Sequence, residues 1–222
     1  KKKEVKQIQF GMREFAIKGK WFYVNGRQTQ LRGTVECCTF LLTGYPPTDV
    51  KSWERIFRIC RSSGLNHIRF HSYCPPEAAF IAADLVGIYL QPEGPAWHNH
   101  GVRLGNGAPI DKYLMDETIR LTREYGNYAS YCMLASGNEP SGNWVAWVTD
   151  FVKYWEKTDP RRVYTGASGG NGWQWQPQNQ LHVKAGARGL NWKNEQPESI
   201  SDYREKIDTV MQPYISHENG QW

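Results

Sequence analysis

Short apolar runs alternate with segments of helical periodicity from residue 31 to residue 216, and this alternation most narrows the choice of fold. The segment 50–62 shows the helical pattern, with Trp53, Phe57 and Cys60 on one face. Strands that alternate with helices pair in parallel. The sequence predicts seven strands, at 31–40, 65–70, 87–91, 131–136, 163–165, 181–184 and 214–216. It predicts helices at 50–62, 76–86, 111–125, 144–155 and 201–210.

Seven parallel strands are one fewer than a TIM (β/α)₈ barrel requires, and residues 31–222 are fewer than the roughly 250 typical of that fold. The predicted fold is therefore an α/β barrel truncated after its seventh strand. Such a barrel has two exposed edge strands. We expect self-association through that open edge.

The first 30 residues have a β pattern instead. Residues 1–14 alternate apolar and polar side chains, which predicts a short β segment that ends a separate preceding domain. Residues 15–24 form a second strand-like run before Asn25-Gly26, a pair that accepts the positive φ angles of a tight hairpin turn. The return strand is expected to reach Gly33, so the domain boundaries are 1–14 and 15–222.

Composition excludes several classes of function. The net charge of +5 comes from basic residues scattered among acidic ones, so no basic face for nucleic acid is expected. No apolar run approaches the ~18 residues of a membrane helix. The 5 cysteines lack the paired spacing of a zinc site, and most are interpreted as small buried hydrophobic residues. We expect neither a cofactor nor a metal; Glu93 with His98 and His100 is interpreted as a chance grouping.

Two acids occupy equivalent places in the pattern. Glu139 follows the strand 131–136 and Glu218 follows the strand 214–216, about three strand–helix repeats later. Pro140 is expected to hold Glu139 in an extended conformation. Two carboxylates at the carboxyl end of one sheet are what glycoside hydrolysis needs. The alternative for Glu139 is that it only caps the following helix.

The motifs around these acids resemble those of glycoside hydrolase family 2, the family of bacterial β-galactosidases, β-glucuronidases and β-mannosidases. The resemblance covers nearly the whole chain. The motifs that carry it are Phe10-Gly11-Met12-Arg13-Glu14-Phe15, Phe22-Tyr23-Val24-Asn25-Gly26-Arg27, Leu31-Arg32-Gly33, Asn66-His67-Ile68-Arg69, Gly87-Ile88-Tyr89-Leu90, Gly137-Asn138-Glu139-Pro140 and His217-Glu218-Asn219-Gly220.

The resemblance implies a fragment of a bacterial enzyme whose residues 15–222 belong to the catalytic barrel. Residues 1–14 would then be the last strand of a preceding immunoglobulin-like β-sandwich domain. Glu218 would be the nucleophile and Glu139 the acid/base of a retaining β-glycosidase, which hydrolyses β-linked sugars by double displacement. A glycan-degrading bacterial enzyme would be periplasmic or secreted rather than cytoplasmic.

Six further residues are candidates for binding the oligosaccharide or glycoside substrate. Arg69 could keep Glu218 ionised, and Asn138 could bind the sugar 2-hydroxyl or only satisfy the turn. Glu93 ends the third strand, where it could bind sugar or a cation. The remaining candidates are His71, at a strand end, and two aromatic residues that could serve as sugar platforms or as packing, Trp97 and Trp173. The alternative function is a non-catalytic carbohydrate-binding barrel fragment.

Overall fold

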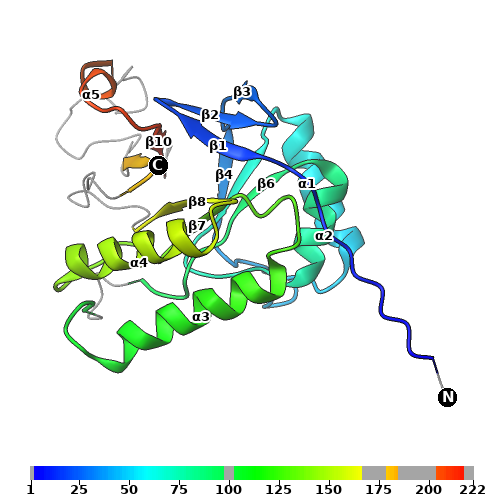
Figure 1. The fold of residues 1–222 in the computed structure, drawn as a ribbon. Coiled ribbons are helices and arrows are strands. Elements are labelled where there is room, and N and C mark those ends of the chain that lie inside the picture. Colours follow the sequence, from blue (N-terminus) through cyan, green and yellow to red (C-terminus); the bar gives the residue numbers. More distant parts are fainter. Residues whose placement is uncertain (1–2, 98–102, 167–178, 185–203, 218–222) are drawn as a thin grey trace.

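The structure is a computed structural model that describes residues 3–97, 103–166, 179–184 and 204–217. Its elements alternate as the sequence predicts, after an initial three-stranded sheet (Figure 1). The strands are β1 (Phe15–Lys18), β2 (Trp21–Val24), β3 (Arg27–Thr29), β4 (Gly33–Glu36), β5 (His67–Phe70), β6 (Tyr89–Gln91), β7 (Met133–Ala135), β8 (Val163–Thr165), β9 (His182–Lys184) and β10 (Tyr214–Ser216). The helices are α1 (Val50–Ser62), α2 (Glu77–Val86), α3 (Pro109–Tyr125), α4 (Trp144–Thr158) and α5 (Arg204–Asp208).

Strands β4 to β8 are joined in parallel and in chain order, and β9 and β10 form a separate parallel pair. Ladders join β4, β5 and β6, then β7 with β8, and β9 with β10. Isolated bridges from Leu90 to Tyr131 and from Glu93 to Ala135 connect β6 to β7. Within the described ranges no pairing joins β4 to β10, so this part of the chain shows no closed barrel.

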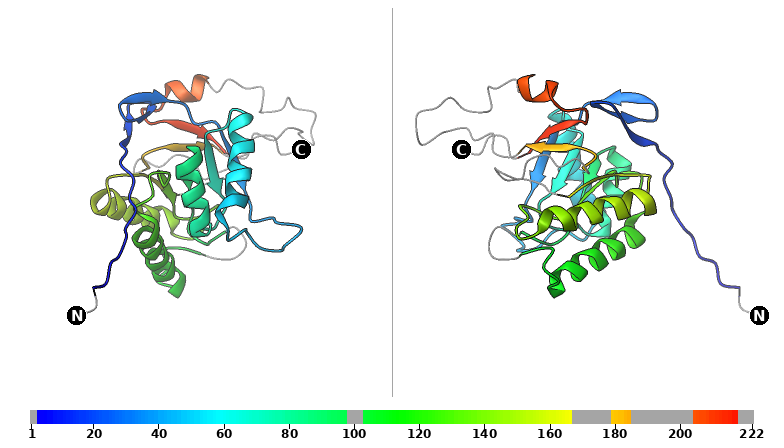
Figure 2. Two further views of the ribbon diagram at one scale, coloured as in Figure 1. Left: turned by 90° about the vertical axis from the view of Figure 1, so that its right-hand side faces the viewer. Right: turned by 60° about the vertical axis from the view of Figure 1, so that its left-hand side comes forward.

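Helices cover the outer face of the strands in two pairs (Figures 1 and 2). Helices α1 and α2 pack on β4–β6 through Trp53, Phe57 and Phe70, and the Trp53 and Phe70 rings meet edge to face at 6.0 Å between centroids. Helix α4 packs on β8, where the Trp155 and Tyr164 rings stack. Burying each such side chain stabilises the fold by roughly 1.5–3 kcal/mol.

The β1–β3 sheet closes the amino end of the strand array. Phe15 and Phe22 pack with Met133, Val163 and Leu181 in one buried cluster. These contacts are made at or near the first residues of the parallel strands. Polar side chains are therefore left for the opposite, carboxyl end of the array.

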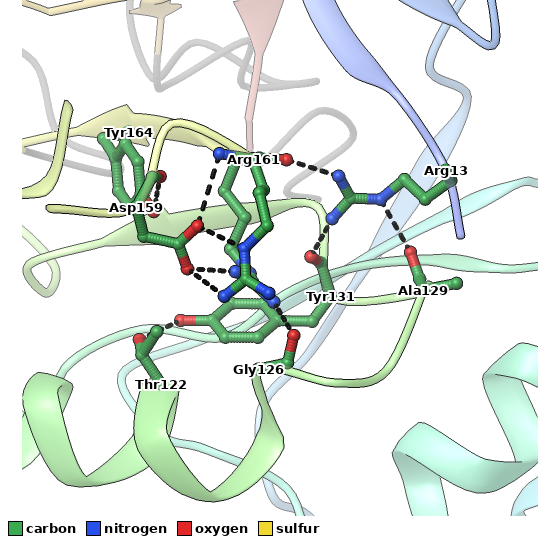
Figure 3. Close-up of polar contacts among 9 residues, drawn as sticks. Arg13, Thr122, Gly126, Ala129, Tyr131, Asp159, Arg161 and Tyr164 are labelled. Atoms are coloured by element: carbon green, nitrogen blue, oxygen red, sulfur yellow. Dashed lines mark hydrogen bonds and ion pairs between the residues drawn. The ribbon is translucent and has the colours of Figure 1, made fainter. Parts of the chain in front are cut away.

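Arg13 fastens the N-terminal segment to that amino end (Figure 3). Its guanidinium donates hydrogen bonds to the backbone carbonyls of Ala129, Tyr131 and Arg161. Beside it, the Asp159 carboxylate accepts from the guanidinium groups of Arg161 and Arg162. We call Arg13 and its three carbonyl acceptors the Arg13 anchor.

Several local predictions are wrong. Residues 15–24 are two strands rather than one, because a turn at Gly19, with φ of +57°, reverses the chain. Residues 3–14 form no strand here, and their assignment to another domain stays a prediction. The predicted strand 31–40 is regular only over β4, and the last helix ends at Asp208 rather than at residue 210. Of the five cysteines, only Cys132 is buried. Cys60 and Cys74 are half-buried, and Cys37 and Cys38 lie in the exposed segment after β4.

Candidate active site

A buried ion pair forms the centre of the polar carboxyl end. Arg69 of β5 donates from Nε to Oε1 of Glu93 at 2.6 Å and from Nη2 to Oε2 at 3.3 Å. Both side chains are almost completely buried, at 1% and 0% exposure. The backbone N–H of Ser72 adds a bond of 2.9 Å to Glu93 Oε2. A buried charge needs such partners, and removing one partner of a buried pair typically costs about 3–5 kcal/mol.

Strand register explains why these side chains meet. Arg69 pairs with Gln91 across the β5–β6 ladder, and Glu93 follows Gln91 by two residues, so all three point to the same side. Between the two bridges that join β6 to β7, the β7 segment is one residue longer than the β6 segment. This extra residue is a β-bulge, a feature that re-aims side chains at sheet ends.

Asn138 joins the pair to the next strand. Its Oδ1 accepts from Arg69 Nη2 at 2.7 Å, and the side chain is fully buried. Its Nδ2 has no hydrogen-bond partner among the described residues. Leaving a buried donor without a partner typically costs about 1–3 kcal/mol. The amide therefore both completes the Arg69 network and presents a donor that a ligand could satisfy.

Glu139 lies beside this network in a strained backbone conformation. Its φ of +47° falls in the left-handed region, so the predicted extended conformation is wrong. Backbone pairing holds the chain on both sides of Glu139: Asn138 N donates to the Ala96 carbonyl, and Leu104 N donates to the Ser141 carbonyl. These two contacts fix the path of the chain through Glu139 and override the local preference set by Pro140. Non-glycine residues in such conformations are found most often at functional sites.

The Glu139 carboxylate receives a hydrogen bond from an aromatic residue. Trp97 Nε1 donates to Oε2 of Glu139 at 2.5 Å. The Trp97 ring in turn meets the His71 ring edge to face, with 5.0 Å between centroids. Glu139 does not act as the cap of α4, since the N-cap position belongs to Asn143.

Two buried histidines complete the inner face. Burial, followed by the nearby Arg69 charge, lowers the pKa of His67 to about 4. The same two causes hold the pKa of His217 well below its usual value, with His67 and His71 adding to the effect. Both imidazoles are therefore neutral near pH 7. In the described part of the chain, His67 Nε2 and both ring nitrogens of His217 have no hydrogen-bond partner.

The structure thus brings together six of the eight residues named from the sequence: Arg69, His71, Glu93, Trp97, Asn138 and Glu139. Glu218 and Trp173 lie outside the described residues, so the carboxyl separation and the contact of Arg69 with Glu218 stay predictions. Arg69 is buried rather than in bulk solvent. Its charge is close enough to His217, the residue before Glu218, to lower the pKa of that imidazole.

Sequence reasoning missed His67, Gln91 and His217 as members of the site. A signal was present for the first two, because His67 precedes Arg69 by two residues and Gln91 precedes Glu93 by two. Residues two apart on a strand share a face. No comparable signal singles out His217, which directly precedes Glu218.

Among the described residues, no group of three or more His, Cys, Asp or Glu is arranged to hold a metal ion. In that same part of the chain, every helix is too short or too polar to cross a membrane.

The similarity of this chain to known proteins is one of fold rather than of sequence. No protein-family model and no curated protein sequence matches the chain. The fold is similar to that of β-glucuronidase from Ruminococcus gnavus in complex with uronic deoxynojirimycin, with a TM-score of 0.76 and 18% identity over 93% of this chain and 38% of that chain. β-Glucuronidase from Parabacteroides merdae has a TM-score of 0.71 and 19% identity, and the match covers 93% of this chain and 27% of that chain. A glycosyl hydrolase family 2 member from Bacteroides cellulosilyticus has a TM-score of 0.61 and 21% identity, and the match covers 73% of this chain and 22% of that chain. The chain therefore spans less than half of each of these proteins, and the likeness concerns the fold.

Proposed function

We propose that this chain is the larger part of the catalytic (β/α)₈ barrel of a retaining β-glycosidase, in which Glu139 is the acid/base and Glu218 the nucleophile. One observation carries the proposal: Arg69, Glu93, Asn138 and Glu139 converge at the carboxyl ends of three neighbouring parallel strands. Enzymes built on parallel barrels place their active sites at that end. Solved glycosidases that share the fold support the same class of reaction.

In the proposed reaction Glu218 attacks the anomeric carbon of a β-linked sugar and forms a glycosyl ester. Glu139 gives its proton to the departing glycosidic oxygen. In the second half, Glu139 takes a proton from water, and the water oxygen displaces Glu218 from the sugar. Retention requires the two carboxyl groups to lie roughly 5–5.5 Å apart.

The Arg69 network has two roles in this proposal. The positive charge of Arg69 acts on His217, the residue before Glu218, and in this proposal it favours the ionised form of the Glu218 carboxylate. It also holds Oδ1 of Asn138, so that the buried Nδ2 is directed to an acceptor such as a sugar hydroxyl. Hydrogen bonds to the 2-hydroxyl strengthen toward the transition state of this reaction.

The test is hydrolysis of a panel of aryl β-glycosides by the full-length protein and by three variants. Glu218→Ala should abolish turnover, and Glu139→Ala should lower it by about 10²–10⁴-fold for poor leaving groups. Added azide should restore turnover of Glu139→Ala and yield a β-glycosyl azide. Glu124→Ala, an exposed position on α3, is the control and should keep full activity. An α-configured azide product would reject the retaining mechanism.

A second candidate is carbohydrate binding without cleavage. The observation that favours it is that no pairing joins the first parallel strand, β4, to the last, β10, among the described residues. An open array leaves one wall of a sugar pocket incomplete. Residues 1–222 alone should then bind a glycoside that only the full-length protein hydrolyses, as calorimetry and a turnover assay would show.

A further inference from the structure

Trp97 holds the Glu139 carboxylate by a contact that a sugar platform does not need. The indole Nε1 donates to Oε2 of Glu139 at 2.5 Å, while the Trp97 side chain remains 47% exposed. A platform offers its flat face to a sugar ring. The polar edge of this ring is instead directed to the candidate acid/base.

The backbone around Trp97 fixes this direction. Trp97 forms a parallel bridge with Asn138, whose N–H donates to the Ala96 carbonyl at 2.9 Å. One step earlier, Gly94 N donates to the Ala135 carbonyl at 3.0 Å. The pairing of β6 with β7 therefore continues past the ends of both strands. The backbone pairing alone therefore places Trp97 next to Glu139.

The other side of the ring is also held. His71, which follows β5, meets the Trp97 ring edge to face at an angle of 77°. His71 N donates to the Glu36 carbonyl at 2.9 Å, so the backbone of His71 is bonded to the end of β4. Trp97 therefore lies between a residue at the end of β5 and the carboxylate that follows β7.

We propose that Trp97 is a positioning residue that binds Oε2 of Glu139 and so assigns the catalytic proton to Oε1. The inference rests on the proposed function. An indole N–H can only donate, so Oε2 must accept when the bond is present. The hydroxyl oxygen of a carboxylic acid accepts a hydrogen bond less well than the carbonyl oxygen does, so a protonated Glu139 favours its hydrogen on Oε1, from which it can be given to the leaving group. The bond also selects one orientation of a carboxylate whose backbone is already strained at φ of +47°.

The decisive variant is Trp97→Phe in the full-length protein, which removes the donor and keeps an aromatic ring beside His71. Its substrates are the phenyl and 2,4-dinitrophenyl β-glycosides of the sugar that the panel identifies. Acid catalysis contributes about 10²–10⁴-fold, so a misplaced acid should lower kcat/KM, which reports the glycosylation step, by about tenfold for the phenyl glycoside. The dinitrophenyl group needs no proton to depart, so that substrate should keep its kcat/KM.

The matched control is Trp21→Phe, because Trp21 is a tryptophan of similar exposure, 46%, in β2 at the other end of the molecule. It should leave both substrates unaffected. An equal fall in kcat/KM for the two leaving groups would make Trp97 a sugar platform and overturn the inference. Unchanged kinetics for Trp97→Phe would overturn it as well.

A measurement without substrate separates this inference from the proposed function. In protein labelled with ¹⁵N-tryptophan, the Trp97 indole N–H resonance should lie downfield and move upfield in Glu139→Ala. The Trp21 resonance should not move. If the protein hydrolyses no aryl β-glycoside, the proposed function fails, while a downfield Trp97 resonance that depends on Glu139 still supports the contact. A resonance insensitive to Glu139→Ala would reject the contact itself.

Discussion

At the scale of single residues, the buried Arg69–Glu93 pair gives the largest expected effect on stability. Glu93→Gln keeps the shape of the side chain but leaves the Arg69 charge buried without a counter-charge. Removing one partner of such a pair should lower the free energy of unfolding by about 3–5 kcal/mol, measured by urea denaturation. The control is Glu117→Gln, whose ion pair with Arg120 is solvent-exposed and should matter by less than about 1 kcal/mol. Equal effects of the two substitutions would show that the Arg69 charge is not buried in solution.

His67 predicts a dependence of stability on pH. Its pKa is about 4 in the folded chain and about 6.5 when unfolded, so between these values the unfolded chain binds more protons. Stability is therefore fully present above pH 6.5 and is lost as the pH falls toward 4. From pH 7 to pH 5 the free energy of unfolding should drop by about 2 kcal/mol through His67.

Denaturation of the unmodified chain and of His67→Gln at both pH values checks this effect. The variant should lose less stability on acidification than the unmodified chain does. An identical acid response in the two proteins would contradict a buried neutral His67.

The residues of the site could be predicted where they end a strand. Arg69, Glu93, Asn138 and Glu139 each lie at or just after an apolar run, and all four belong to the carboxyl-end cluster. The contact between Trp97 and Glu139 could not be predicted. Both residues lie in loops without periodicity, and their contact depends on a pairing between those loops that no local pattern encodes.

At the scale of elements, the continued pairing of β6 with β7 depends on Gly94. A Cβ added there would lie 2.1 Å from the Ser136 carbonyl oxygen, a backbone atom that cannot move aside. Gly94→Ala should therefore separate the two loops, reduce stability by more than about 2 kcal/mol and weaken catalysis. Gly107→Ala meets no atom within 4 Å and carries only the strain of its φ of +74°, about 1–2 kcal/mol. Thermal denaturation of the two variants compares them, and a smaller loss for Gly94→Ala would refute this account of the loops.

The sequence could predict the bounds of some elements, among them α1, β8 and β10, better than those of others. The predicted 50–62 coincides with α1, because one apolar face and the N-cap Asp49 define it. The predicted strand 31–40 shrinks to β4, because regular strand structure requires a partner and only Gly33–Glu36 pairs with β5. Strand length is thus decided by the neighbouring chain, which a single sequence does not reveal.

At the scale of the whole molecule, β4 and β10 each have a strand partner on one side, and no pairing joins them to each other among the described residues, which predicts self-association of residues 1–222. An edge strand presents free backbone donors and acceptors, and a gap one strand wide would separate edges by about 10 Å. Sedimentation should give masses above 25.6 kDa that rise with concentration. Thr34→Lys, at an exposed position on β4, should reduce the association because a lysine on an edge strand opposes pairing. A monomer at all concentrations would indicate edges that are already covered.

The Arg13 anchor has a consequence for how freely this chain can vary. All three acceptors are main-chain carbonyls, of Ala129, Tyr131 and Arg161, and any residue at those positions supplies the same carbonyl. The donor side has no such latitude, because only a guanidinium offers several N–H groups in one planar fork. The two sides of the anchor should therefore differ in their tolerance of substitution. In a saturation library, many amino acids at Ala129 and almost none other than arginine at position 13 should give a folded protein.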